Sequence, residues 1–135
     1  MKISILLPVS NDVKHCKKTI KSIISQSYKN FELLVGFNGN SKKYENEIKK
    51  EFSKYKKIKF YNIKEKNIVS ALNLLILKSS GEYCARIDAD DLAKKDRIKQ
   101  QVNYLKKNKS DFLSSNCIVT GKNSEFLYIH KTNIN

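Results

Sequence analysis

Short apolar runs alternate along the chain with segments of helical periodicity, and this alternation constrains the fold more than any other feature. Strands are expected over Ile3–Val9, Phe31–Gly36, Ile58–Ile63 and Glu82–Ile87, and less regular ones over Phe112–Thr120 and Glu125–Ile129. Helices are expected over Val13–Gln26, Lys42–Tyr55, Ile68–Lys78 and Lys94–Lys107. Strand and helix in alternation are typical of a parallel sheet with right-handed crossovers. We therefore expect an α/β fold with a mostly parallel sheet flanked by helices.

Two of these segments also indicate their place in the fold. The strand Ile3–Val9 is almost continuously apolar, as expected for a strand buried on both faces. The helix Ile68–Lys78 is apolar around most of its circumference, so we expect it to lie against the sheet. Asp12 stands just before the first helix, where an aspartate commonly caps the first turn.

The size and composition favour one cytoplasmic domain. With 135 residues and no linker or repeat, residues 1–135 are expected to form a single domain. The apolar runs are far shorter than the roughly 20 residues that span a bilayer, and the first residues lack a signal-peptide pattern. The cysteines have no paired spacing, so we expect reduced, part-buried thiols at Cys16, Cys84 and Cys117.

The charge is strongly positive, with 27 Lys and Arg against 13 Asp and Glu, a net +14. Such a charge suits a polyanionic partner: a nucleotide diphosphate, an acidic membrane surface or a nucleic acid. A solvated coat of lysines explains it equally well. Nucleic acid is the least favoured partner, because the lysines alternate with glutamates and there are no Arg clusters or stacking motifs.

An acidic cluster follows the fourth expected strand. Asp88, Asp90 and Asp91 lie within four residues at a carboxyl end of the sheet, which is where ligands bind in such folds. A divalent cation would offset their mutual repulsion, and oxygen ligands suit Mg²⁺ or Mn²⁺ with substrate phosphates completing the coordination. The alternative is that these residues only form a turn and cap the next helix.

Other nucleotide and nucleophile motifs are missing from the chain. The first strand is followed by Ser10 and not by G-x-G-x-x-G, and there is no phosphate-binding G-x-x-x-x-G-K-S/T loop. The only histidines, His15 and His130, are expected at the surface and not in a catalytic triad.

Several segments together resemble the inverting family 2 glycosyltransferases of GT-A fold. They occur in that family's order and cover most of residues 2–109: ISILLPVSND, TIKSIISQSYKNFELLV, SALNLLILKSSGEYCARIDADD and DRIKQQVNYLKKN. The resemblance implies a nucleotide-diphosphate sugar donor, usually a uridine diphosphate sugar, bound with Mn²⁺ or Mg²⁺. It also implies transfer to an acceptor hydroxyl with inversion. The acceptor would be a glycan or a lipid-linked molecule, which allows peripheral contact with the inner face of a membrane.

The resemblance also implies roles for individual residues. Asp90 would coordinate the metal, and Asp88 would contact the donor ribose or the metal and its water shell. Three residues match the first-strand segment that lies against the nucleotide base: Pro8, Val9 and Ser10. Arg86 could reach phosphate, or could instead form a salt bridge to Glu82 or Asp88.

The chain departs from the family pattern at three points. Asn38 stands where the family usually carries an acidic residue that contacts the base, so a nucleotide other than uridine is an alternative. Ile68-Val69 replaces a glycine near the diphosphate. Asn73, at the family's A-x-N position, is expected to be either a buried amide bonded to backbone or a ligand contact.

No catalytic base is assigned. Active family members continue into an acceptor-binding half that supplies this carboxylate, whereas only Asp111 and Glu125 follow the last long helix here, and neither lies in a recognisable motif. We therefore expect the chain to be either part of a longer transferase or a non-catalytic module that binds a nucleotide sugar. In either case a partner chain or further domain would supply the acceptor site.

Overall fold

The computed structural model describes residues 1–132, which fall into two compact units, Met1–Gln100 and the residues from Gln101 onward. The elements are, in order, β1 (Ile3–Val9), α1 (Cys16–Ile24), β2 (Phe31–Asn38), α2 (Lys42–Phe52), β3 (Ile58–Ile63), α3 (Ile68–Lys78), β4 (Tyr83–Arg86), α4 (Arg97–Asn108), β5 (Cys117–Thr120) and β6 (Phe126–His130). The assignment of residues 1–135 to a single domain stays a prediction.

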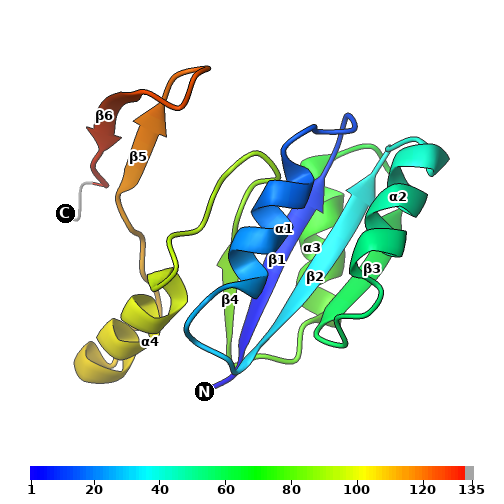
Figure 1. The fold of residues 1–135 in the computed structure, drawn as a ribbon. Helices are drawn as coiled ribbons and strands as arrows, with labels where there is room; N and C mark the ends of the chain where they lie inside the picture. The colour runs from blue at the N-terminus through cyan, green and yellow to red at the C-terminus, as the bar shows by residue number, and fades with distance from the viewer. Residues whose placement is uncertain (133–135) are drawn as a thin grey trace. The chain divides into compact units, whose positions relative to one another are not determined.

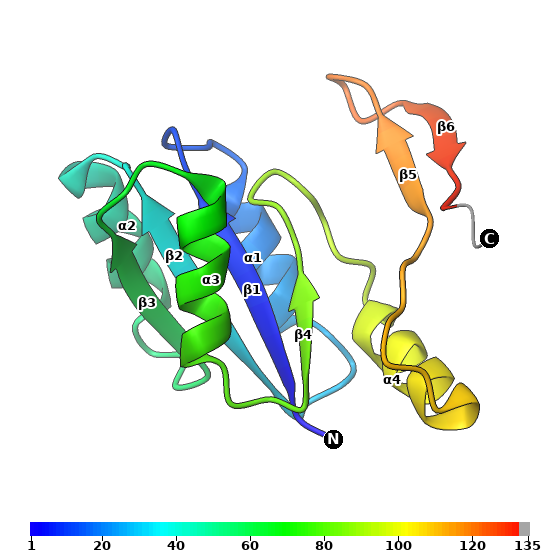
Figure 2. The same ribbon diagram turned by 180° about the vertical axis from the view of Figure 1, so that it is seen from behind.

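The first unit is a four-stranded sheet in the order β3-β2-β1-β4, with every neighbouring pair parallel. Helices α1 and α2 cover one face of this sheet (Figure 1), and α3 covers the opposite face (Figure 2). The predicted α/β architecture, a mostly parallel sheet flanked by helices, is confirmed.

Strands β1 and β2 form the centre of the core, and every residue of both strands is buried. On the α3 face, Leu6 and Leu34 pack with Leu75 of the helix. Gly36 lets α3 approach closely, because a Cβ there would lie 2.8 Å from Ile63 Cδ1 and 3.2 Å from Leu75. The buried strand predicted at Ile3–Val9 is therefore confirmed.

The loop between β1 and α1 differs from the prediction. Helix α1 begins at Cys16 and not at Val13, and in the loop before it Asn11 and Asp12 adopt left-handed backbone conformations with φ of 56° and 48°. Asp12 does not cap α1. Its carboxylate accepts hydrogen bonds from the Ser41 backbone N–H (3.0 Å), the Ser41 hydroxyl (2.6 Å) and the Asn40 amide (3.2 Å), so it ties this loop to the start of α2.

Helix α3 is less covered than its composition predicts. Ala71 and Leu75 are buried against the sheet, but Val69 and Leu77 on the other side are 62% and 80% exposed. Asn73 is also exposed, so the expectation of a buried amide there is wrong.

The second unit contains most of α4 and an antiparallel hairpin of β5 and β6, in which Cys117 lies opposite His130. All three cysteines are free thiols, but only Cys16 is buried. Cys84 and Cys117 are exposed, so the expectation of part burial is wrong for them. None of the helices within residues 1–132 has the length and apolar character needed to cross a membrane.

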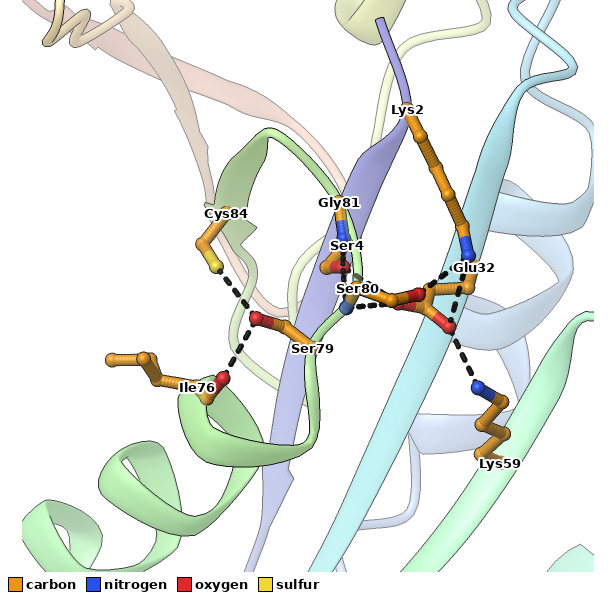
Figure 3. A network of polar contacts seen from close by, with 9 residues as sticks. All are labelled: Lys2, Ser4, Glu32, Lys59, Ile76, Ser79, Ser80, Gly81 and Cys84. Atoms are coloured by element: carbon orange, nitrogen blue, oxygen red, sulfur yellow. Dashed lines mark hydrogen bonds and ion pairs between the residues drawn. The ribbon is translucent and has the colours of Figure 1, made fainter.

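A buried carboxylate fastens the turn after α3 to the sheet (Figure 3). Glu32 Oε1 accepts hydrogen bonds from the Ser4 hydroxyl (2.7 Å), the Ser80 backbone N–H (2.7 Å) and the Ser80 hydroxyl (2.8 Å). Its Oε2 accepts one from Lys59 Nζ (2.9 Å), and Lys2 Nζ lies 3.5 Å away. Burial raises the pKa of Glu32, but these hydrogen bonds outweigh it and lower the pKa to about 2.

Candidate functional site

A pocket of about 290 Å³ lies where β1 and β4 end. Four of its lining residues were predicted from the sequence: Pro8, Ser10, Asp88 and Asp90. Val13, Ile68, Arg86 and Ala89 complete the lining. Residues about 80 positions apart in the chain therefore meet at one carboxyl edge of the sheet, because β1 and β4 are parallel neighbours.

Two other predicted residues do not line this pocket. Val9 is completely buried and packs in the core. Asn38 is the last residue of β2. Because Phe37 pairs with Val9 of β1, Asn38 lies beside Ser10, the residue that follows β1. Its side chain is 4% exposed, and within residues 1–132 its Oδ1 has no hydrogen-bond donor. A buried acceptor without a partner is costly to the fold, and Asn38 stays a predicted base contact.

Arg86 forms a salt bridge with Asp88, one of the two roles considered for it. Arg86 Nε lies 3.0 Å from Asp88 Oδ1, and Nη2 lies 3.3 Å from Oδ2. Glu82, the other acid considered, pairs with the N-terminal ammonium of Met1 at 3.2 Å. The Arg86 guanidinium is therefore held against Asp88 at the pocket.

The acidic residues form a turn, in which the Asp91 N–H donates to the Asp88 carbonyl at 3.1 Å. They do not cap the next helix, which begins at Arg97. Burial and the negative charges of Asp90 and Asp88 raise the pKa of Asp91, while Arg97 lowers it.

Two polar side chains, one in α1 and one just after it, hold this turn and the segment that follows it, and sequence reasoning missed both. The Thr19 hydroxyl donates to the Ala89 carbonyl at 2.8 Å. Gln26 donates to the Lys94 carbonyl at 2.8 Å and accepts from the Ile98 N–H at 3.1 Å. Thr19 and Gln26 are both fully buried. The signal in the sequence was a pair of polar residues seven positions apart, with Thr19 on the apolar face of α1 and Gln26 just beyond the end of this helix.

The residues present supply only part of the coordination of a divalent cation. Asp88 and Asp90 offer carboxylate oxygens to one pocket, as Mg²⁺ and Mn²⁺ require. Among residues 1–132, however, no three His, Cys, Asp or Glu side chains are grouped so that they could hold a metal ion. Phosphate oxygens of a bound substrate would have to complete the coordination.

Known proteins resemble this chain in sequence and in fold. The family Glycosyl transferase family 2 matches residues 4–134. An uncharacterized glycosyltransferase of Rickettsia conorii is 36% identical over 107 residues, 79% of this chain and 18% of that protein. The chain thus spans about a fifth of this relative.

Two solved structures share the fold at low sequence identity. S. aureus TarS 1-349 in complex with UDP-GlcNAc has a TM-score of 0.72 and 21% identity, over 82% of this chain and 33% of TarS. The mannosyltransferase PcManGT from Pyrobaculum calidifontis, in complex with GDP-Man and Mn²⁺, has a TM-score of 0.70 and 18% identity, over 77% and 32%. The fold is GT-A, as predicted, and the chain belongs to glycosyltransferase family 2.

Proposed function

We propose that the pocket between β1 and β4 binds the diphosphate of a nucleotide-sugar donor with a divalent cation, in the service of glycosyl transfer. The observation that carries this proposal is the meeting of Asp88 and Asp90 with Pro8 and Ser10 around one pocket. The similarity to structures bound to UDP-GlcNAc and to GDP-Man with Mn²⁺ supports it.

Asp90 and Asp88 would hold the Mn²⁺ or Mg²⁺, which screens the diphosphate and stabilises the charge on the leaving group. Arg86 is positioned to donate to a phosphate oxygen once its pairing with Asp88 is released. An acceptor hydroxyl would then attack the anomeric carbon of the sugar from the side opposite to the diphosphate, and the configuration at this carbon would be inverted.

The base of the donor would lie toward the carboxyl ends of β1 and β2, near Ser10 and Asn38. The Asn38 amide can accept a hydrogen bond at Oδ1 and donate one from Nδ2, which complements the N3–H and O4 groups of uracil. A uridine diphosphate sugar is therefore the first donor to test, and guanosine diphosphate sugars are the comparison.

The acceptor, a glycan or lipid-linked molecule, and the base that deprotonates it would come from a further domain or a partner chain. A specific observation bears on this: the chain spans 18% of its Rickettsia conorii relative and about a third of the solved transferases. A module that binds the donor without transferring the sugar is the second candidate function.

Calorimetric titration of the chain with UDP, with and without Mn²⁺, tests the donor site. We expect binding that requires Mn²⁺ and is lost in Asp90→Asn, but kept in the control Asp111→Asn, an exposed aspartate in the second unit. Equal binding by both variants would contradict the proposal. Release of the sugar from UDP-GlcNAc then separates the two candidates, because the non-catalytic module predicts binding without turnover.

A further inference from the structure

A second cavity lies at the opposite end of the sheet from the donor pocket. It has a volume of about 360 Å³ and is formed where the chain enters β2 and β3. Its apolar lining residues are Ile24, Phe31, Tyr55 and Ile58, and its basic lining residues are Lys29, Lys54, Lys56 and Lys57. No acidic residue lines it.

The four lysines of this cavity lack the ion pairs that other lysines form. All four are exposed, and none of them has a carboxylate partner within residues 1–132, whereas six other lysines pair with Glu32, Glu45 or Glu51. Positive charge therefore accumulates around an apolar cavity.

Part of this charge is held in place by the structure. Lys57 Nζ lies 5.2 Å from the centre of the Phe31 ring and donates to the Lys29 carbonyl, and Lys54 Nζ lies 5.3 Å from the centre of the Tyr55 ring. Lys29 Nζ donates to the Gln26 carbonyl at 2.7 Å. These neutral partners orient the ammonium groups and leave their charge uncompensated.

We propose that this cavity, lined by the four lysines and the apolar residues Ile24, Phe31, Tyr55 and Ile58, binds anionic phospholipid at a bilayer surface. The lysines would contact the phosphate and the apolar residues the adjoining acyl and glycerol carbons. A nucleic acid fits less well, because lysine ammonium groups already occupy a face of both aromatic rings, on which a base would stack.

The proposal does not depend on the donor pocket, which lies at the carboxyl ends of the strands. The first test is co-sedimentation with phosphatidylcholine vesicles, with and without phosphatidylglycerol. We expect the chain to sediment only with the phosphatidylglycerol vesicles, and to do so in the absence of nucleotide and Mn²⁺. Failure here therefore leaves the donor site untouched.

A matched pair of variants separates this site from general attraction between opposite charges. Lys56→Glu combined with Lys57→Glu changes the cavity. Lys18→Glu combined with Lys43→Glu makes the same charge change at exposed lysines outside it, which also form no ion pair with any residue that the structure describes. We expect vesicle binding to fall at least tenfold in the first variant and less than threefold in the second. Equal losses would overturn the proposal.

A second measurement does not rely on the variants being folded. Isotope-labelled wild-type chain is titrated with a short-chain phosphatidylglycerol and, separately, with glycerol 3-phosphate, and backbone amide shifts are followed by NMR. Shifts centred on Ile24, Tyr55 and Ile58 with the lipid, and much weaker ones with glycerol 3-phosphate, support a lipid site. Shifts spread over all lysines, or equal shifts with both ligands, contradict it.

Discussion

Arg86 contacts both carboxylate oxygens of Asp88, at 3.0 and 3.3 Å, inside the pocket that Asp90 also lines. A cation bound to Asp88 must therefore compete with this guanidinium. Because the pair is about half exposed, its removal should change affinities only modestly. We expect Arg86→Met to bind Mn²⁺ alone about two- to fivefold more tightly, measured by electron paramagnetic resonance.

The same variant should bind UDP with Mn²⁺ more weakly, because one phosphate donor is lost. Tighter binding of Mn²⁺ alone together with weaker binding of UDP with Mn²⁺ would indicate that Arg86 moves from the Asp88 carboxylate to a phosphate of UDP. Lys18→Met, an exposed lysine away from the pocket, is the control and should change neither affinity. Weaker binding of Mn²⁺ by Arg86→Met would show that the arginine only orients Asp88.

Asn38 offers a test of base contact that leaves the fold intact. Since its Oδ1 has no partner within residues 1–132, Asn38→Ala removes no hydrogen bond from this atom and should change the unfolding temperature little. Loss of the contact to the base should weaken UDP binding about two- to tenfold in calorimetry. Asn46→Ala, an exposed amide on α2, should bind UDP like the wild type, and an unchanged affinity in Asn38→Ala would remove this residue from the site.

Gln26 should affect both stability and the donor site, because it holds the segment that follows the acidic turn. Gln26→Met keeps the side-chain volume but leaves the Ile98 N–H without its acceptor, and it removes one of the two donors to the Lys94 carbonyl, which also accepts from the Arg97 N–H. We expect a loss of about 2 to 4 kcal/mol in the free energy of unfolding, measured with urea. Gln100→Met, at an exposed position on α4, should lose less than about 0.5 kcal/mol.

The hydrogen bonds of Gln26 also show what could not be predicted from the sequence. The parallel sheet could be predicted from the continuous apolar run of β1 and from the alternation of strands and helices. Strands that are buried on both faces and connected by helices form few kinds of sheet other than a parallel one. The partners of Thr19 and Gln26 lie about 70 positions away in sequence, and only tertiary packing brings them together.

The prediction that Asp12 caps the first helix was wrong for a related reason. An aspartate before a helix was interpreted as its cap, but the left-handed backbone at Asn11 and Asp12 directs the carboxylate to Ser41 on another element. The residues next to Asp12 in sequence indicate which hydrogen-bond partners are possible. Which of them it binds depends on how close a distant segment, here the start of α2, comes in the folded chain. The structure brings Asp88 and Asp90, which the resemblance implies as metal ligands, to one pocket, while their role as ligands stays a prediction. The sequence left open whether Arg86 would pair with Asp88, with Glu82 or with a phosphate, and the structure shows the pair with Asp88.

Glu32 provides a prediction of acid sensitivity with a defined sign. Its pKa is lowered from 4.5 to about 2, so ionised Glu32 stabilises the folded chain fully above about pH 4.5. This contribution is lost as the pH falls from 4.5 toward 2, and the shift corresponds to about 3 kcal/mol. The unfolding free energy, measured by urea titration at several pH values, should fall across this window.

Glu32→Gln should be less stable than the wild type at pH 7, because Lys59 and Lys2 lose their counter-charge, and the difference should shrink as the pH falls toward 2. Glu47→Gln, an exposed glutamate with no ion pair within residues 1–132, should follow the wild-type curve. Since Glu32 holds Ser80 and lies at the amino end of β2, its loss should leave Mn²⁺-dependent UDP binding unchanged at pH 7. A stability difference that stays constant from pH 7 to pH 2 would show that the network acts by packing and not by charge.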